Sequence, residues 1–207
     1  MRKGLFLLII LFCSNLGIIA QEKDDEIETV FKNGGKTHHG FYFAPQIKLS
    51  NFDKEVAFFT GLRGAWVINR SVAIGFEGNG LIPTIAENWT IPFYRVRPLA
   101  GYGGIFVEPI LKSNKVAHIT LPILFGAGWA GYIEDWEGNI DPEENVLDEH
   151  VFWVIEPAIN VELNVTKFFR LAAGVSYRFT QDLELINTNK SALQGVNYNF
   201  MLKFGKF

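Results

Sequence analysis

Residues 150–179 read HVFWVIEPAINVELNVTKFFRLAAGVSYRF and contain two alternating segments joined by a short polar break. In residues 151–164, one face carries Trp153, Ile155, Ile159, Val161 and Leu163, and the other carries Glu156, Asn160 and Glu162. In residues 168–180, the corresponding sets are Phe169, Leu171, Val175, Tyr177 and Phe179 against Arg170, Ser176 and Arg178. A period of two is typical of β-strands with one apolar and one polar face. The stretch therefore predicts a β-hairpin.

The same alternation recurs along the chain and predicts eight strands. We expect them at residues 40–50, 55–69, 71–82, 93–110, 117–132, 151–164, 168–180 and 194–207. The links at 51–54, 83–92, 133–150 and 181–193 are long, whereas those at 70, 112–115 and 165–167 are short. This alternation predicts an all-β, eight-stranded antiparallel up-and-down transmembrane β-barrel with short periplasmic turns and longer extracellular loops. The parity of the fourth strand stays open, because Arg95 and Arg97 share it with Leu99, Ile105 and Val107.

The composition of the two faces indicates which one is outside. The polar face combines charged residues with small ones, among them Ala57, Gly61, Ala65, Ala73, Gly75, Gly126, Gly128, Ala130, Ala172 and Gly174. A narrow lumen in which side chains share space favours this mixture, and the bulky apolar face then contacts lipid. A soluble periplasmic barrel that turns its apolar face inward around an apolar ligand is the alternative.

The N-terminus carries the pattern of an exported protein. Arg2 and Lys3 precede an apolar run, and small residues lead to Ala20 before Gln21, so residues 1–20 are predicted to be a signal peptide. Residues 21–39 are predicted to form an acidic periplasmic N-terminal arm, and residues 40–207 the barrel. Cleavage removes two of the 19 basic residues and leaves 22 acidic ones, which argues against nucleic-acid binding. The one cysteine, Cys13, lies within the signal.

Residues 150–179 and the terminal FMLKFGKF resemble the small eight-stranded outer-membrane β-barrel proteins of Gram-negative bacteria, the OmpA/OmpX-like group. The resemblance implies an outer-membrane location, contact with outer-membrane lipids, recognition by the barrel-assembly machinery during biogenesis, and a monomer. It also implies an assembly signal at the C-terminus, here Phe200, Leu202, Phe204 and Phe207. Phe207 is out of register with the other three, so we expect a bulge at Gly205 to restore it or the signal to be weaker than usual.

Charged residues of the polar face are predicted to form a charge network in the lumen. Its expected members are Arg63, Glu77, Glu156, Glu162, Arg170, Arg178 and Lys203. Counting back from the short turns places Arg63 opposite Glu77 and Glu162 opposite Arg170. Five prolines, Pro45, Pro98, Pro109, Pro122 and Pro157, fall within the predicted strands, and we expect bulges to accommodate them.

Three motifs suggest chemistry, but each has a simpler explanation. Gly126–Gly131 matches a dinucleotide-binding pattern, yet a loop follows where a helix is required. His118 and Thr120 share the polar face and fit a hydrogen-bonded lumen histidine better than a lipase site. The acidic loop at residues 133–150 lacks EF-hand spacing and is predicted to be a solvated loop. We therefore expect no catalytic residue, no metal and no cofactor.

These observations favour a non-enzymatic outer-membrane barrel with a side-chain-filled lumen, which acts structurally or through its surface loops. The sequence does not identify the loop partner. Besides the soluble ligand-binding barrel, a lipid-modifying barrel enzyme remains as an alternative, and His118 is its candidate residue.

Overall fold

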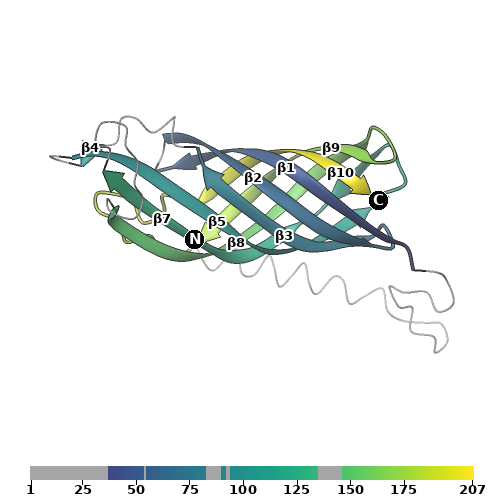
Figure 1. The fold of residues 1–207 in the computed structure, drawn as a ribbon, viewed down its shortest axis with the longest axis horizontal. Coiled ribbons are helices and arrows are strands. Elements are labelled where there is room, and N and C mark those ends of the chain that lie inside the picture. Colours follow the sequence, from purple (N-terminus) through teal and green to yellow (C-terminus); the bar gives the residue numbers. More distant parts are fainter. Residues whose placement is uncertain (1–36, 54, 83–89, 92–93, 135–145) are drawn as a thin grey trace, which may run out of the picture. The chain divides into compact units, whose positions relative to one another are not determined.

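The computed structural model describes residues 37–53, 55–82, 90–91, 94–134 and 146–207, which fold as antiparallel β-structure (Figure 1). The strands are β1 (His39–Phe52), β2 (Glu55–Ile68), β3 (Val72–Leu81), β4 (Thr90–Ile91), β5 (Tyr94–Leu111), β6 (Ala117–Thr120), β7 (Ile123–Glu134), β8 (Val146–Asn164), β9 (Phe169–Thr180) and β10 (Gly195–Lys206). No helix in these ranges is long and apolar enough to cross a membrane. The predicted signal peptide and most of the N-terminal arm lie outside the described residues.

The sheet closes into a ring with eight strand positions. β1 pairs with β2 on one side and with β10 on the other, and the order continues through β9 and β8. β6 and β7 follow one another in the next position, each pairing with β5 and β8, and β3 pairs with β5 to close the ring. β4 forms a short hairpin with the start of β5. The fold is thus the predicted eight-stranded barrel, with the fifth predicted strand divided in two.

The in-strand prolines are accommodated without bulges. β6 ends before Leu121 and β7 begins after Pro122, yet the register of β5 is the same on both sides: Ile110 pairs with Thr120 and Val107 with Ile123. The ladders also skip Pro45 between β1 and β10, and Pro157 between β8 and β9, with unchanged register beyond each. A proline lacks an N–H donor, so one ladder loses hydrogen bonds locally while its neighbours hold the alignment. The expectation of bulges at these prolines was wrong.

Strand ends differ from the sequence-based boundaries at the long-loop end of the barrel. β1 extends to Phe52, which leaves a link of only two residues before β2. β8 begins at Val146 instead of residue 151, so part of the predicted long loop is strand. One register shift occurs here, at Tyr132 and Ile133 between β7 and β8. At this end of the barrel, β1 and β8 therefore extend into residues that the sequence predicted to be loops.

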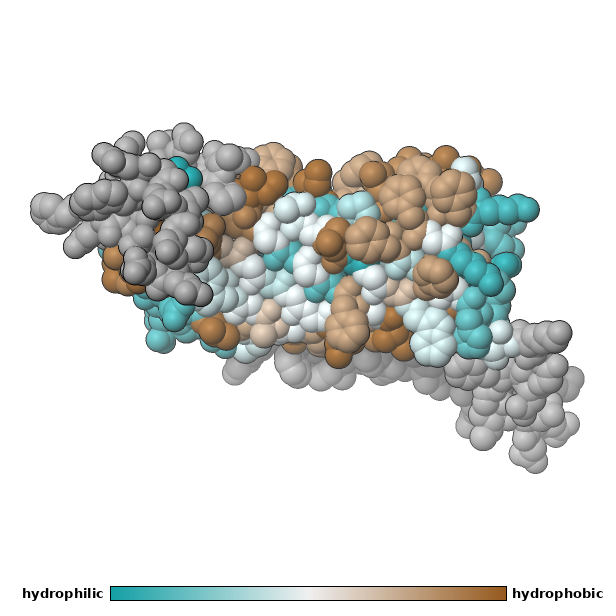
Figure 2. All heavy atoms as spheres, viewed as in Figure 1, coloured by the Kyte–Doolittle hydropathy of each residue, from teal (hydrophilic) through white to brown (hydrophobic). Residues whose placement is uncertain are grey.

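The apolar face points outward, as predicted. Phe41, Trp66, Phe76, Trp153 and Phe200 are all about half exposed or more, and Figure 2 shows apolar side chains along the strand wall and hydrophilic ones at the rim near the C-terminus. In β5, the parity is settled: Ile105 and Val107 face outward with Arg97, and Tyr102, Phe106 and Glu108 face inward. Apolar side chains on the outside are favourable in lipid and unfavourable in water.

Candidate functional site

All seven predicted members of the charge network have buried side chains in the lumen. None is more than 5% exposed. Alternation along the strands places them there, because every second residue of a closed sheet faces the interior. The structure adds two buried charges that the sequence-based set omits, Lys48 on β1 and Glu108 on β5. We call these nine residues the lumen charge network: Lys48, Arg63, Glu77, Glu108, Glu156, Glu162, Arg170, Arg178 and Lys203.

The central part of the network joins five strands, β1, β2, β3, β5 and β8, through shared carboxylates. Arg63 Nε lies 2.8 Å from Glu77 Oε2, and Arg63 Nη1 lies 3.0 Å from Glu108 Oε2. Lys48 Nζ lies 2.7 Å from both Glu77 Oε1 and Glu156 Oε1. Each carboxylate therefore receives charge-assisted hydrogen bonds from cations on other strands, which offsets the cost of burying it.

Lys203 connects this centre to a second cluster near the short turns. Its Nζ lies 2.7 Å from Glu108 Oε1 and also contacts Glu162 Oε1. Glu162 Oε2 lies 3.2 Å from His118 Nε2 and 3.7 Å from Arg170 Nη1. Glu162 is thus the carboxylate that collects the charges at this end of the lumen.

The two predicted facing pairs have different outcomes. Arg63 lies directly opposite Glu77 in the β2–β3 ladder, in the predicted register. Glu162 lies opposite Ala172 instead of Arg170, because the β8–β9 register differs from the prediction by two residues. The hydroxyl of Thr166 accepts hydrogen bonds from the amides of residues 168 and 169 and stabilises a longer turn than the three residues assumed. A shift of two preserves the faces, so Arg170 and Glu162 still meet diagonally.

Arg178 lies toward the long-loop end and is held mostly by neutral groups. Its Nε donates to the Leu193 carbonyl at 2.6 Å, and its Nη2 donates to Ser50 Oγ at 2.9 Å. Its guanidinium lies 4.7 Å from the ring centroid of Phe59 and 5.0 Å from that of Tyr102. Cation–π contacts of this kind partly replace the missing carboxylate.

The β9–β10 loop packs into the barrel at this same end. The side chains of Leu183, Leu185, Ala192 and Leu193 are buried and belong to the apolar core of the lumen. The Ala192 carbonyl accepts a hydrogen bond from the Asp53 amide, and Asp148 accepts one from the Ile186 amide. The loop is therefore tied to the β1–β2 turn and to β8, and its leucines fill the lumen beneath it.

His118 and Thr120 lie inside the lumen beside Glu162, on the polar face that the sequence predicted. Thr120 Oγ1 donates to Glu162 Oε1 at 3.3 Å. A histidine, a hydroxyl and a carboxylate are thus close together. However, His118 is only 4% exposed, so a substrate outside the barrel does not reach it. Within the ranges that the structure describes, no group of three or more His, Cys, Asp or Glu side chains could hold a metal ion. Most of the acidic loop lies outside those ranges.

The residues of the predicted assembly signal do not all face the same way. Phe200 and Phe204 are exposed on the outside and Leu202 is half-buried on the same face. β10 continues without a bulge through Gly205, which pairs with Tyr42. Phe207 consequently turns inward, stacks on Tyr42 at 5.9 Å between centroids, and covers the guanidinium of Arg170 at 3.8 Å. Of the two alternatives for Phe207, the bulge at Gly205 is therefore wrong.

A closed sheet of eight strand positions with an apolar outer face defines an outer-membrane-type β-barrel, and the fold of one solved structure agrees with it. The crystal structure of neisserial surface protein A (NspA) matches with a TM-score of 0.52 and 12% identity over 84% of this chain and 100% of that one. The crystal structure of Ail, the attachment invasion locus protein of Yersinia pestis, gives 0.46 and 8% over 82% and 97%. No family model and no curated protein matches the sequence. The chain has the fold of the small eight-stranded outer-membrane β-barrels of Gram-negative bacteria.

Proposed function

We propose that this protein is a non-enzymatic outer-membrane barrel that is closed to solutes and acts structurally or through its surface loops. The occupied lumen carries the proposal. The lumen charge network fills the interior with salt bridges from seven strands, and the leucines of the β9–β10 loop pack over one end. Eight strands leave an interior only wide enough for side chains. A solute would therefore have to break buried ion pairs to pass.

Two measurements test the proposal: the conductance of the purified protein and its location in the cell. Full-length protein reconstituted in planar bilayers should show no stable open channel, and sustained large conductance would contradict the proposal. In cells, we expect recovery in the outer-membrane fraction with heat-modifiable migration on gels. Recovery in the soluble periplasm would favour the apolar-ligand barrel instead, although that barrel needs its apolar face inside and here residues such as Phe41 and Phe76 are exposed.

The lipid-modifying alternative is weakened by the place of His118. A lipid substrate approaches the outer wall of a barrel, whereas the His118 side chain is buried within the lumen and paired to Glu162 at 3.2 Å. Lipid hydrolysis or acyl transfer that is lost in His118→Gln and retained in a His39→Gln control would reinstate it.

Export and assembly belong to the same proposal. We infer that residues 1–20 direct export, that the acidic arm at residues 21–39 lies in the periplasm, and that the barrel-assembly machinery reads the end of β10. The outward aromatics Phe200 and Phe204, with Leu202, support the last point, because they offer an apolar surface on the terminal strand. We expect the protein to be a monomer.

A further inference from the structure

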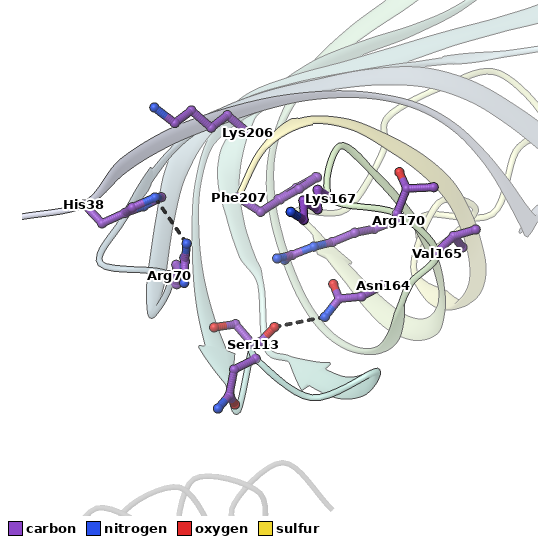
Figure 3. Close-up of a pocket in the computed structure, with 11 residues that line it drawn as sticks. His38, Arg70, Ser113, Asn164, Val165, Lys167, Arg170, Lys206 and Phe207 are labelled. Atoms are coloured by element: carbon purple, nitrogen blue, oxygen red, sulfur yellow. Dashed lines mark hydrogen bonds between the residues drawn. The ribbon is translucent and has the colours of Figure 1, made fainter.

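A cavity opens at the short-turn end of the barrel, away from the β9–β10 loop. Its volume is about 680 Å³, and eleven residues line it (Figure 3). Five of them carry basic side chains, namely His38, Arg70, Lys167, Arg170 and Lys206, and none of the eleven is Asp or Glu. The basic groups come from separate elements: the chain before β1, the β2–β3 turn, the β8–β9 turn, β9 and β10. The closed fold thus gathers positive charge around one opening.

Arg170 forms the floor of this cavity and has spare hydrogen-bond donors. The side chain is 5% exposed, and Figure 3 shows it extending toward the centre of the cavity. Its one described ionic contact, with Glu162, is 3.7 Å long, beyond hydrogen-bond distance. Its neighbour directly across the β9–β10 ladder is another cation, Lys203. A guanidinium has five N–H groups, so most of the donors of Arg170 are left for a ligand.

The carboxylates near Arg170 are already shared with other cations. Glu108 accepts hydrogen bonds from Arg63 and Lys203. Glu162, the carboxylate nearest Arg170, is already bound by Lys203 and His118. Buried cations need a partner, and an anion entering from the cavity would supply one.

At the rim of the cavity, His38 and Arg70 lie side by side. Partial burial, followed by the charges of Arg70 and Lys206, lowers the pKa of His38 below its ordinary value. The His38 Nε2 and Arg70 Nη2 atoms are 3.4 Å apart, an arrangement in which a neutral imidazole can accept from the guanidinium. Figure 3 shows this pair on one side of the cavity, with Lys167 and Arg170 on the other and Lys206 pointing away. An anion between the two sides would contact Arg70, Lys167 and Arg170.

We propose that this cavity is a binding site for an oxyanion of the phosphate class, held by Arg170 from the floor and by Arg70 and Lys167 from the rim. Guanidinium groups match phosphate oxygens in bidentate geometry, and three full cations suit a group that carries more than one negative charge. The phosphate belongs either to a free solute or to the headgroup of an anionic lipid in the adjacent leaflet. The site is independent of whether the lumen conducts.

The experiment titrates inorganic phosphate into ¹⁵N-labelled full-length protein in zwitterionic micelles at constant ionic strength. The side-chain signals of Arg170 and the ring signals of His38 should shift saturably, and the pKa of His38 should rise in phosphate because a nearby anion favours the imidazolium. Constant ionic strength separates a specific site from screening. Arg170→Gln should weaken phosphate binding about tenfold, which corresponds to one lost charged hydrogen bond.

Control variants distinguish the site from general surface charge. The exposed double substitution Arg70→Gln/Lys167→Gln should also weaken phosphate binding about tenfold or more, and it keeps the test valid if Arg170→Gln does not fold. Lys115→Gln removes one positive charge, as Arg170→Gln does, but Lys115 lies on the neighbouring turn outside the lining, so this variant should leave the affinity unchanged. Equal losses in all variants, or no saturable shift, would overturn the proposal.

Nanodiscs separate the two sources of phosphate. If a lipid headgroup occupies the cavity, the Arg170 and His38 signals in phosphatidylglycerol discs should already resemble the phosphate-bound state, and added phosphate should bind more weakly than in phosphatidylcholine discs. If free phosphate is the ligand, the two kinds of disc should give the same starting spectra and the same affinity. Unshifted signals in both discs and no response to phosphate would refute both sources.

Discussion

Arg63 and Glu77 face each other across the β2–β3 hairpin, and their contact is the centre of a chain of buried ion pairs. Arg63 Nε lies 2.8 Å from Glu77 Oε2 in a directly opposed pair. Through Glu108 on β5 and Lys48 on β1, the same contact extends to two further strands. The interior of the barrel is thus cross-linked by charge rather than filled by apolar groups alone.

Removing one member of this pair should cost more than removing both. Arg63→Met and Glu77→Leu should each lower the free energy of unfolding by about 3–5 kcal/mol, since each leaves a buried charge uncompensated. The double variant should lower the free energy of unfolding by much less than the sum of the two single losses. The remaining partners stay paired, because Lys48 still contacts Glu156 and Glu108 still contacts Lys203. Urea unfolding in phospholipid vesicles measures the cycle. Additive losses would show that the two residues are not coupled.

The β9–β10 loop should contribute to stability through its buried leucines. Leu193 is fully buried and its carbonyl accepts from Arg178, so Leu193→Ala should cost about 2–5 kcal/mol. Ile186 lies on the same loop but is 52% exposed, and Ile186→Ala should stay within about 0.5 kcal/mol. Thermal unfolding of the two variants under the same conditions gives the comparison. Equal effects would mean that the loop is not packed into the lumen.

The sequence was sufficient for strand number, the lipid-facing side and one register. Alternation fixes the faces because lipid and lumen demand opposite polarity. The β2–β3 register was predictable because a tight turn leaves few choices: Asn69 and Arg70 adopt positive φ angles of 51° and 57°, as in primed hairpin turns. The β8–β9 register was not predictable from the sequence. The hydroxyl of Thr166 stabilises the turn there, and the residue types alone do not specify the length of that turn.

The site was only partly predictable, for a related reason. The sequence identifies which residues face the lumen, but not which of them meet across it. Lys48 and Glu156 both face the lumen, yet the two residues that meet there are 108 positions apart in the sequence. Glu108 was missed because Arg95 and Arg97 obscured the parity of β5, although the outward Val107 and Ile105 point to it. The basic side chains around the cavity at the short turns come from five separate elements.

Gly126 should be needed for close approach of β5 and β7. A Cβ atom on Gly126 would lie 2.0 Å from the Gly103 carbonyl oxygen and 2.8 Å from Gly104 Cα, both backbone atoms. Gly126→Ala should therefore destabilise the barrel by about 1–3 kcal/mol through overpacking. Gly78→Ala is the matched control, since its Cβ would meet nothing within 4 Å. If both substitutions lower the free energy of unfolding equally in urea, close approach of β5 and β7 does not explain the glycine at position 126.

His38 should make stability depend on pH at the short-turn end. Its pKa is lowered in the folded protein by partial burial and then by Arg70 and Lys206, so the unfolded chain binds a proton first. Stability should fall as the pH drops below the unfolded value of about 6.5 and level off once folded His38 is protonated. The difference between wild type and His38→Gln isolates this contribution. Arg70→Gln should raise the His38 pKa in an NMR titration. An unchanged His38 pKa would show that the charge of Arg70 does not act on the imidazole.

Substitution of two aromatic residues at the end of the chain should have different effects, one on assembly in cells and the other on the stability of the folded barrel. Phe204 points outward, where we propose that the assembly machinery reads it, whereas Phe207 turns inward over Arg170 and Tyr42. Phe204→Ala should slow insertion in cells while the isolated refolded barrel loses little. Phe207→Ala should instead lower the free energy of unfolding by about 0.5–2 kcal/mol, because it removes a cation–π contact from a desolvated guanidinium. Pulse-chase assembly in cells and urea unfolding in vesicles give the two readouts. If Phe207→Ala slows assembly as much as Phe204→Ala and leaves unfolding unchanged, the inward ring serves the assembly signal and not the lumen.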